Sequence, residues 1–266
     1  MLEQALNGLE QINRPEILIF VTILAVILVA ISKSGFGGAL GSLGLPVMVF
    51  VFPPKLAIAV LLPLYLIIDL FVAYTWRKFP VIKILKVMVL GGLTGQILGW
   101  LCFGYLDDNY ILILIGLLAL ITSIRHFKNL IWKNVIADKT KTYIKSSFLR
   151  AMGWCGFSGF SSFVALTGGI PAQIYLLPMG LERQLFVGTM SFYFLIINLA
   201  KLPFFFDLGV FSPTSILLSL LVLPILPIGI FLGKFLNKTL SDKMFYHISH
   251  FALFCCGVNL ISKQLL

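Results

Sequence analysis

Charged and polar side chains interrupt several long apolar stretches of this chain. Lys33 and Ser34 lie in "AISKSGFGG", Asp69 lies in "LIIDLF", and Asn198 and Lys201 lie in "IINLAKLP". Asn198 and Lys201 are three residues apart and therefore share one face of a helix. Lysine ammonium and amide N–H groups donate hydrogen bonds to anions, whereas a buried carboxylate can pair with a lysine, carry a proton or cap a helix. These residue types predict an anion site, with Asp69 as a candidate for ion coupling.

Two segments rich in glycine and serine accompany these side chains. The first, residues 31–54, contains Gly37 and Gly38, and the second, residues 155–171, reads "CGFSGFSSFVALTGGIP". Glycine lets a ligand approach the backbone, and the free N–H groups of a broken helix favour anions. We therefore expect a substrate site formed by these residues together: Lys33, Ser34, Gly37, Gly38, Ser158, Ser162, Thr167, Gly168, Gly169, Asn198 and Lys201.

Each candidate also has a structural alternative. The glycines could serve close helix packing, and the hydroxyl groups could bond to the carbonyls of their own helix. Lys33 and Lys201 could snorkel toward a membrane surface, and Lys201 is expected nearer the outer one. The spacing alone leaves these alternatives open.

The surrounding sequence must position these residues in a bilayer. Of 266 residues, 59% are hydrophobic and 11% are charged, against roughly 25% charged residues in soluble domains. The long apolar runs lack the alternation of barrel strands. We predict an all-α polytopic membrane protein with apolar segments at 16–33, 37–52, 55–76, 81–105, 110–125, 147–166, 168–179, 184–206, 213–235 and 245–262.

The charge pattern predicts an orientation. Most of the 20 basic residues lie in short connections or in the polar segment 126–146, which is therefore predicted to be a cytoplasmic linker. Both termini are then outside, and the acidic start has no basic region of a signal peptide. Because the net charge of +10 is distributed in this way, it indicates a lipid bilayer as partner and not a nucleic acid.

Other kinds of chemistry have little support in the sequence. The four cysteines form no C-x-x-C pair, and His247 and His250 are read as interface residues, so no metal or other cofactor is expected. There is no P-loop, HExxH motif or hydrolase triad. A non-enzyme is predicted.

The two halves of the chain resemble each other. "LPVMVFVFP" (45–53) matches "IPAQIYLLP" (170–178), and "IIDL" (67–70) matches "IINL" (196–199). Gly95, Gly99 and Asp108 recur with the same spacing as Gly229, Gly233 and Asp242. We predict two repeats of inverted topology, 1–125 and 147–266, each a broken-helix hairpin followed by three transmembrane helices. Inverted repeats with broken helices are typical of secondary transporters.

At these residues the chain resembles the TauE/SafE sulfite exporter family. The resemblance covers nearly the whole chain and rests on "SKSGFGGALGSLGLPVM", "PPKLAIAVLLPLYLIIDLFVAYTWRKFP", "YLLPMGL", "FVGT", "NLAKLPFFFDLG" and "LPILPIGIFLGKFLNKTLSDKMFY". It implies export of a small sulfur-containing anion, such as sulfite or sulfoacetate, across the bacterial inner membrane. Leu166 and Thr167 stand where relatives often carry a histidine and a small residue, and Ala39 interrupts the first glycine run, so the substrate itself is open.

Two other function classes remain as alternatives. An anion channel on the same architecture would show no saturation at low substrate and no counterflow. An intramembrane enzyme or insertion factor would need a catalytic pair, for which Lys33 with a nearby serine is the one candidate. The coupling ion, the direction of flux and the oligomeric state are not predicted.

Overall fold

The structure, a computed structural model, describes residues 15–36, 41–133, 146–239 and 242–265, and these contain helices and no strand. Six of the described helices or helical stretches are long and apolar enough to cross a membrane: 16–34, 54–75, 82–103, 108–128, 184–207 and 213–236. The prediction of an all-helical polytopic membrane protein is confirmed.

The first half runs from α2 to α6. Its elements are α2 (Pro15–Phe36), the 3₁₀ turn η1 (Gly41–Leu43), α3 (Gly44–Met48), α4 (Pro54–Thr75), α5 (Ile82–Phe103) and α6 (Asp108–Lys133). Pro54 occupies the first turn of α4, where its missing N–H would have no helical partner in any case. Helix α6 continues past residue 125, so the beginning of the predicted linker is helical.

The second half has a similar order. Its elements are α7 (Phe148–Ala165), α8 (Gly169–Leu176), η2 (Leu177–Met179), α9 (Arg183–Asp207), α10 (Pro213–Val222), η3 (Leu223–Ile225), α11 (Leu226–Thr239) and α12 (Asp242–Leu265). The segment predicted as one helix over 213–235 is interrupted at η3. Pro224 and Pro227 explain this break, because proline has no N–H to donate to the preceding turn.

The short helices α3 and α8 do not cross a membrane. They have five and eight residues, whereas a crossing helix needs about 20. The described parts of the apolar segments 37–52 and 168–179 therefore enter the fold without spanning it. Irregular backbone of this kind must be buried in protein or line a polar cavity.

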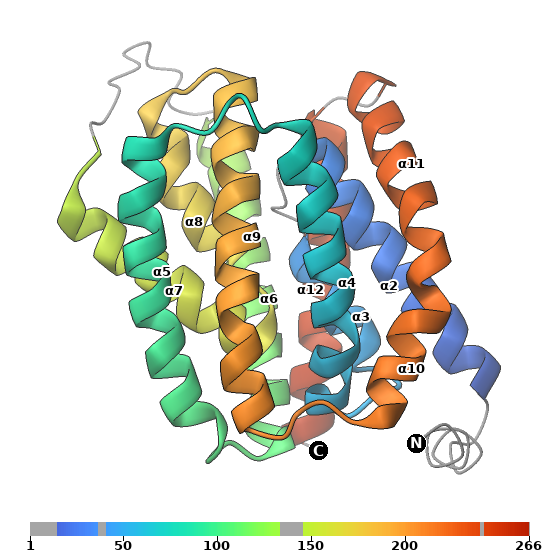
Figure 1. Ribbon diagram of the computed structural model, residues 1–266. Coiled ribbons are helices and arrows are strands. Elements are labelled where there is room, and N and C mark those ends of the chain that lie inside the picture. Colours follow the sequence, from blue (N-terminus) through green and yellow to red (C-terminus); the bar gives the residue numbers. More distant parts are fainter. Residues whose placement is uncertain (1–14, 37–40, 134–145, 240–241, 266) are drawn as a thin grey trace.

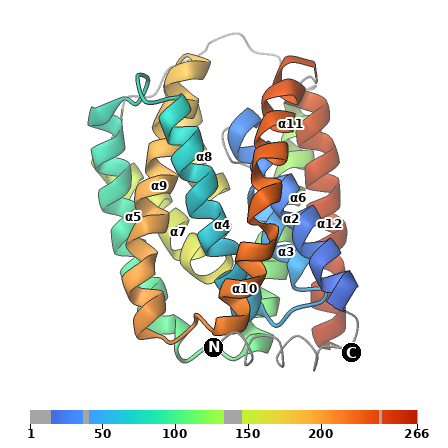
Figure 2. The ribbon, with the colours of Figure 1, turned by 45° about the vertical axis from the view of Figure 1, so that its right-hand side comes forward.

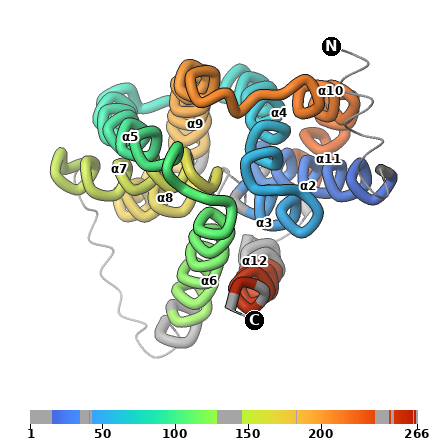
Figure 3. The backbone as a smooth tube through the Cα atoms, turned by 90° about the horizontal axis from the view of Figure 1, so that it is seen from below, coloured from blue at the N-terminus to red at the C-terminus, as the bar shows by residue number. Residues whose placement is uncertain are grey.

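The helices form two bundles. One contains α2, α3, α4, α10 and α11, and the other contains α5, α7, α8 and α9 (Figures 1 and 2). Viewed from below, α6 and α12 lie side by side (Figure 3), and α6 contacts α7 of the second bundle as well as α3 and α4 of the first. Contacts between α4 and α9 join the two bundles. Each bundle therefore combines helices from both halves of the sequence.

Glycines allow the closest contacts within each bundle. A Cβ atom at Gly95 of α5 would overlap the carbonyl of Gly156 on α7. On the other side of the molecule, a Cβ at Gly233 of α11 would overlap Ser34 on α2. Small residues at such positions let helix backbones approach closely in a membrane. Gly95 and Gly233, which belong to the matching glycine patterns of the two halves, thus both lie in close helix contacts.

Candidate functional site

A buried ion pair connects α2 to α4. The Lys33 Nζ atom lies 2.7 and 2.8 Å from the two carboxylate oxygens of Asp69. Both side chains are buried, and the Lys33 ammonium also lies 4.4 Å from the centroid of the Tyr65 ring. Of the three roles considered for Asp69, pairing with a lysine is the one present here. The snorkelling alternative for Lys33 is wrong, because the carboxylate holds its ammonium group inside the protein.

The ion pair continues into the second bundle. The Asn198 amide on α9 donates a hydrogen bond of 2.6 Å to Asp69, and Lys201 donates one of 2.8 Å to the Asn198 carbonyl oxygen. Lys201 also donates to the Ser162 hydroxyl of α7 at 2.8 Å. Five side chains thus form one connected group, the central polar network: Lys33, Asp69, Ser162, Asn198 and Lys201.

Lys201 is the least expected member of this network. Its relative exposure is 0%, so the snorkelling alternative is wrong for Lys201 as well. Because Lys201 follows Asn198 by three residues, both side chains project from the same face of α9, toward the protein interior. Within the described residues, Lys201 has no carboxylate at salt-bridge distance. The network therefore holds two lysines and one aspartate, a composition that favours an additional negative charge.

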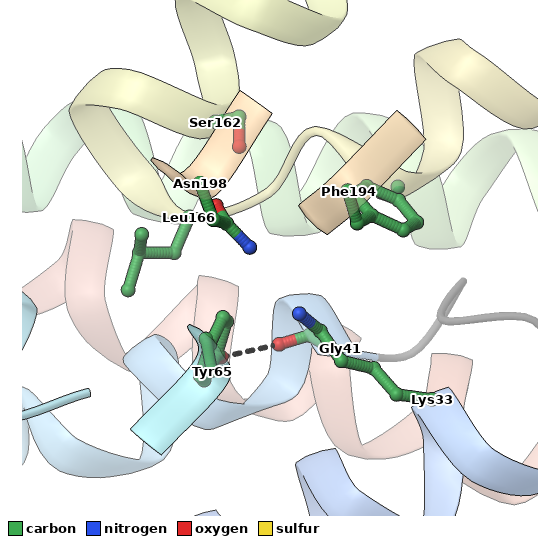
Figure 4. A pocket seen from close by; sticks show the side chains of 8 residues that line it. Lys33, Gly41, Tyr65, Ser162, Leu166, Phe194 and Asn198 are labelled. Atoms are coloured by element: carbon green, nitrogen blue, oxygen red, sulfur yellow. Dashed lines mark hydrogen bonds between the residues drawn. The ribbon is translucent and has the colours of Figure 1, made fainter. Parts of the chain in front are cut away.

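A small pocket lies beside the network, between the two bundles. Figure 4 shows Ser162, Leu166, Phe194 and Asn198 on one side and Lys33, Gly41 and Tyr65 on the other, and Gly169 completes the lining. The cavity volume is about 10 Å³, close to what one water molecule requires. A sulfite ion is larger than water, so an anion of that size can enter only if the bundles separate.

Two aromatic residues of the pocket were missed in the sequence. Tyr65 precedes Asp69 by four residues, and Phe194 precedes Asn198 by four, so each ring shares a helix face with a network residue. The Tyr65 hydroxyl donates to the Gly41 carbonyl at 2.7 Å, which fixes the ring beside Lys33. The identical spacing of the two pairs was the signal that could have identified them.

Other predicted site residues support the helix break between α7 and α8. The Ser158 hydroxyl donates to the Gly168 carbonyl at 2.6 Å and accepts from Tyr193, while Thr167 donates to the Ser161 carbonyl. Leu166 ends α7 with a φ of 52°, a left-handed conformation that is uncommon for residues other than glycine. These contacts hold Ser162 at the edge of the pocket.

The remaining candidates have different positions. Ser34 donates to the carbonyls of Ala30 and Ile230, so it joins α2 to α11 and lies outside the central network. A Cβ at Gly168 would meet the Ser158 carbonyl at 2.6 Å, so this glycine is required for packing, whereas Gly169 lines the pocket. The predictions for Gly37 and Gly38 lie outside the described residues.

All three histidines of the chain lie together between α6 and α12. His126 is 2.9 Å from His247 between ring nitrogens, and its ring stacks on that of His250 with centroids 4.0 Å apart. His247 and His250 were predicted to be interface residues, and the structure places both of them against His126 in the contact between α6 and α12. Within the described residues, no group of three histidine, cysteine or acidic side chains is arranged to hold a metal ion.

The fold and the pocket define a class of protein. Six apolar helices, two short helices that do not cross and a lysine-containing pocket between bundles are the features of an α-helical membrane transport protein. A model of the sulfite exporter TauE/SafE family matches residues 22–260. The chain belongs to this family. A search among curated proteins and a search among solved structures found no match.

Membership in the family defines the general activity. The family consists of membrane transporters and not of enzymes, and its substrates are small anions. The chain is therefore a multi-pass membrane protein of an anion-exporting family. Its polar pocket is lined by Lys33, Ser162 and Asn198, whose N–H and O–H groups can donate hydrogen bonds to an anion.

Proposed function

We propose that this protein is a secondary transporter that exports sulfite, or a related small organosulfonate such as sulfoacetate, across the bacterial inner membrane. The observation that carries the proposal is the excess of lysine over carboxylate side chains in the central polar network. Lys33 is paired with Asp69, whereas the hydrogen bonds of Lys201 within the described residues go to the neutral Asn198 and Ser162. An oxyanion entering the pocket would supply the missing negative charge.

The proposed substrate site includes donors from both bundles. Lys33 comes from α2, whereas Asn198 and Lys201 come from α9 and Ser162 from α7. An anion loses its hydration on entering the membrane and needs fixed donors in exchange. Gly169 is part of the proposed site, and Gly37, Gly38 and Thr167 are retained as neighbours of the two helix breaks.

Alternating access follows from this division of the site. The pocket volume of about 10 Å³ represents a closed state. We propose that the two bundles rock against each other at the contact between α4 and α9, so that the pocket opens toward one side of the membrane at a time. Asp69 is the proposed coupling residue.

The inverted repeat is part of the same proposal. In the proposed repeat, α2, α4 and α6 correspond to α7, α9 and α12, and α5 corresponds to α10 and α11. The α5–α7 contact then corresponds to the contact of α2 with α10 and α11, whereas the α4–α9 and α6–α12 contacts each join two corresponding helices. The pattern supports repeats over 1–125 and 147–266 with a cytoplasmic linker between them and both termini in the periplasm.

The function is tested by sulfite flux into proteoliposomes. Wild-type protein should give saturable flux and counterflow, while flux proportional to concentration without counterflow would indicate a channel. Lys201→Met should weaken sulfite binding at least about tenfold, since a charge-assisted hydrogen bond contributes about 1.5–3 kcal/mol. The matched control is Lys86→Gln, at an exposed lysine outside the pocket. Unchanged binding by Lys201→Met would refute the proposed site.

A further inference from the structure

The carboxylate of Asp69 accepts hydrogen bonds from two of the donors that should bind the substrate, Lys33 and Asn198. It accepts hydrogen bonds from the Lys33 ammonium at 2.7 and 2.8 Å and from the Asn198 amide at 2.6 Å. A carboxylate and a sulfite or sulfonate group are both oxyanions, and they accept the same donors. Asp69 therefore stands where an oxyanion of the substrate would be bound.

We propose that Asp69 is a tethered competitor of the transported anion, which must displace this carboxylate from Lys33 and Asn198 in order to bind. The inference rests on the proposed function and specifies how its site is regulated. In the closed state Asp69 satisfies donors that would otherwise be buried without a partner. When the anion leaves, the carboxylate returns and prevents rebinding.

The position of the competitor links binding to movement of the bundles. Asp69 belongs to α4, whereas Asn198 belongs to α9, and these helices join the two bundles. The hydrogen bond between them therefore joins the two bundles at Asn198, which lines the pocket. An anion that takes over the Asn198 amide breaks this bond, so occupancy of the site favours separation of α4 from α9.

The charges around Asp69 make displacement possible. Lys33 from α2 and Lys201 from α9 both interact with it electrostatically. A displaced carboxylate can remain within the field of these two lysines while the anion occupies the donors. Tyr65, one turn earlier on α4, also interacts with it electrostatically. The short helix α3 and helix α10, which also pack against α4, contain no charged residue.

The central test is Asp69→Asn, measured by sulfite binding to purified protein and by flux in proteoliposomes. Removing the competing charge should tighten binding at least about tenfold, the factor expected for one freed charge-assisted bond. Net export should fall at the same time, because nothing displaces the bound anion. A lower KM together with a lower maximal rate is therefore expected. Unchanged or weaker sulfite binding would overturn the proposal.

A second variant makes the test independent of how Asp69→Asn folds. Asn198→Asp places another carboxylate beside the same lysines and should weaken sulfite binding at least about tenfold. The exchange variant, Asp69→Asn with Asn198→Asp, retains one carboxylate and one amide and should return toward wild-type affinity. Tighter sulfite binding by Asn198→Asp would overturn the proposal that the Asp69 carboxylate competes with the anion.

The controls separate this inference from the function itself. Ser219→Ala removes a buried hydroxyl that contacts the Val60 carbonyl of α4 outside the network, and it should leave sulfite affinity unchanged. If Lys201→Met and Asp69→Asn both bind sulfite more weakly, the proposed substrate site is supported and the proposal that Asp69 competes with the anion is refuted. If neither variant changes binding, the proposed site fails and the competitor with it.

Discussion

At the scale of single residues, the pairing of Lys33 with Asp69 lowers the free energy that burial of their two charges would otherwise cost. Each ion has lost its hydration, and the low-dielectric interior makes an unpaired charge expensive. Asp69 accepts from both Lys33 and Asn198, so its oxygens are satisfied. The pair therefore matters for stability as well as for substrate binding, and variants of either residue must be tested for both.

This pairing gives a prediction for stability. Lys33→Met leaves the Asp69 charge buried without its cation and should destabilise the protein by about 3–5 kcal/mol. The double variant Lys33→Met with Asp69→Leu should recover most of this loss, since an apolar pair can replace a buried ion pair at little cost. Thermal unfolding in detergent measures both effects, with Lys86→Gln as the control. If the stability losses of the two single substitutions add up in the double variant, the two side chains do not stabilise each other as a buried ion pair.

At the scale of helices, the contact between α5 and α7 depends on the absence of side chains. Gly91 faces the Ala151 carbonyl, Gly95 faces Gly156, and a Cβ at Gly159 would overlap Gly92. Backbones this close gain dispersion energy along the whole contact. The glycines of the chain therefore contribute to helix packing as well as to the candidate site.

A pair of glycine variants tests this packing. Gly95→Leu should lower thermal stability by about 1–3 kcal/mol or more, because the overlapping atom is a backbone carbonyl that cannot move aside. Gly153→Ala is the matched control on α7, since a Cβ there meets no atom within 4 Å. Its stability should be unchanged or slightly higher, as alanine favours a helix. Equal losses of thermal stability in both variants would mean that the loss comes from replacing any glycine and not from the close α5–α7 contact.

At the scale of the whole molecule, the connections lie at two opposite ends. The α5–α6 and α9–α10 turns lie at one end of the helices, and the α4–α5 and α8–α9 connections lie at the other (Figure 1). The second end is rich in basic residues, including Arg77, Lys78 and Arg183. Positive charge on cytoplasmic connections predicts that this end faces the cytoplasm.

Cysteine labelling in intact cells tests this orientation. In a background without the four native cysteines, Asn109→Cys should react with a membrane-impermeant maleimide, because residue 109 is exposed in the first turn of α6, next to the α5–α6 connection. Lys78→Cys, also exposed, should react only after the cells are permeabilised. The opposite pattern would invert the orientation and with it the cytoplasmic position of the linker.

The sequence by itself determined the class of the protein and most of its helices. Long apolar runs and few charges require a bilayer, and the positions of proline and glycine predicted both helix breaks. Motifs spread along the chain also indicated the family, and the family match confirms it. These features depend on composition and on local spacing, which are visible in one dimension. The helix break at Pro224 was missed because an apolar run looks continuous until backbone hydrogen bonds are followed.

Only the tertiary structure decided which polar residues meet. The sequence singled out Lys33, Asp69, Asn198 and Lys201, but it could not tell a buried lysine from a snorkelling one. That distinction depends on which way a helix face turns when helices from both halves pack together. Ser34 and Gly168 were predicted alongside the network residues and were found in packing contacts instead. Contacts such as Asp69 with Asn198 join residues far apart in the chain, and three-dimensional packing alone brings them together.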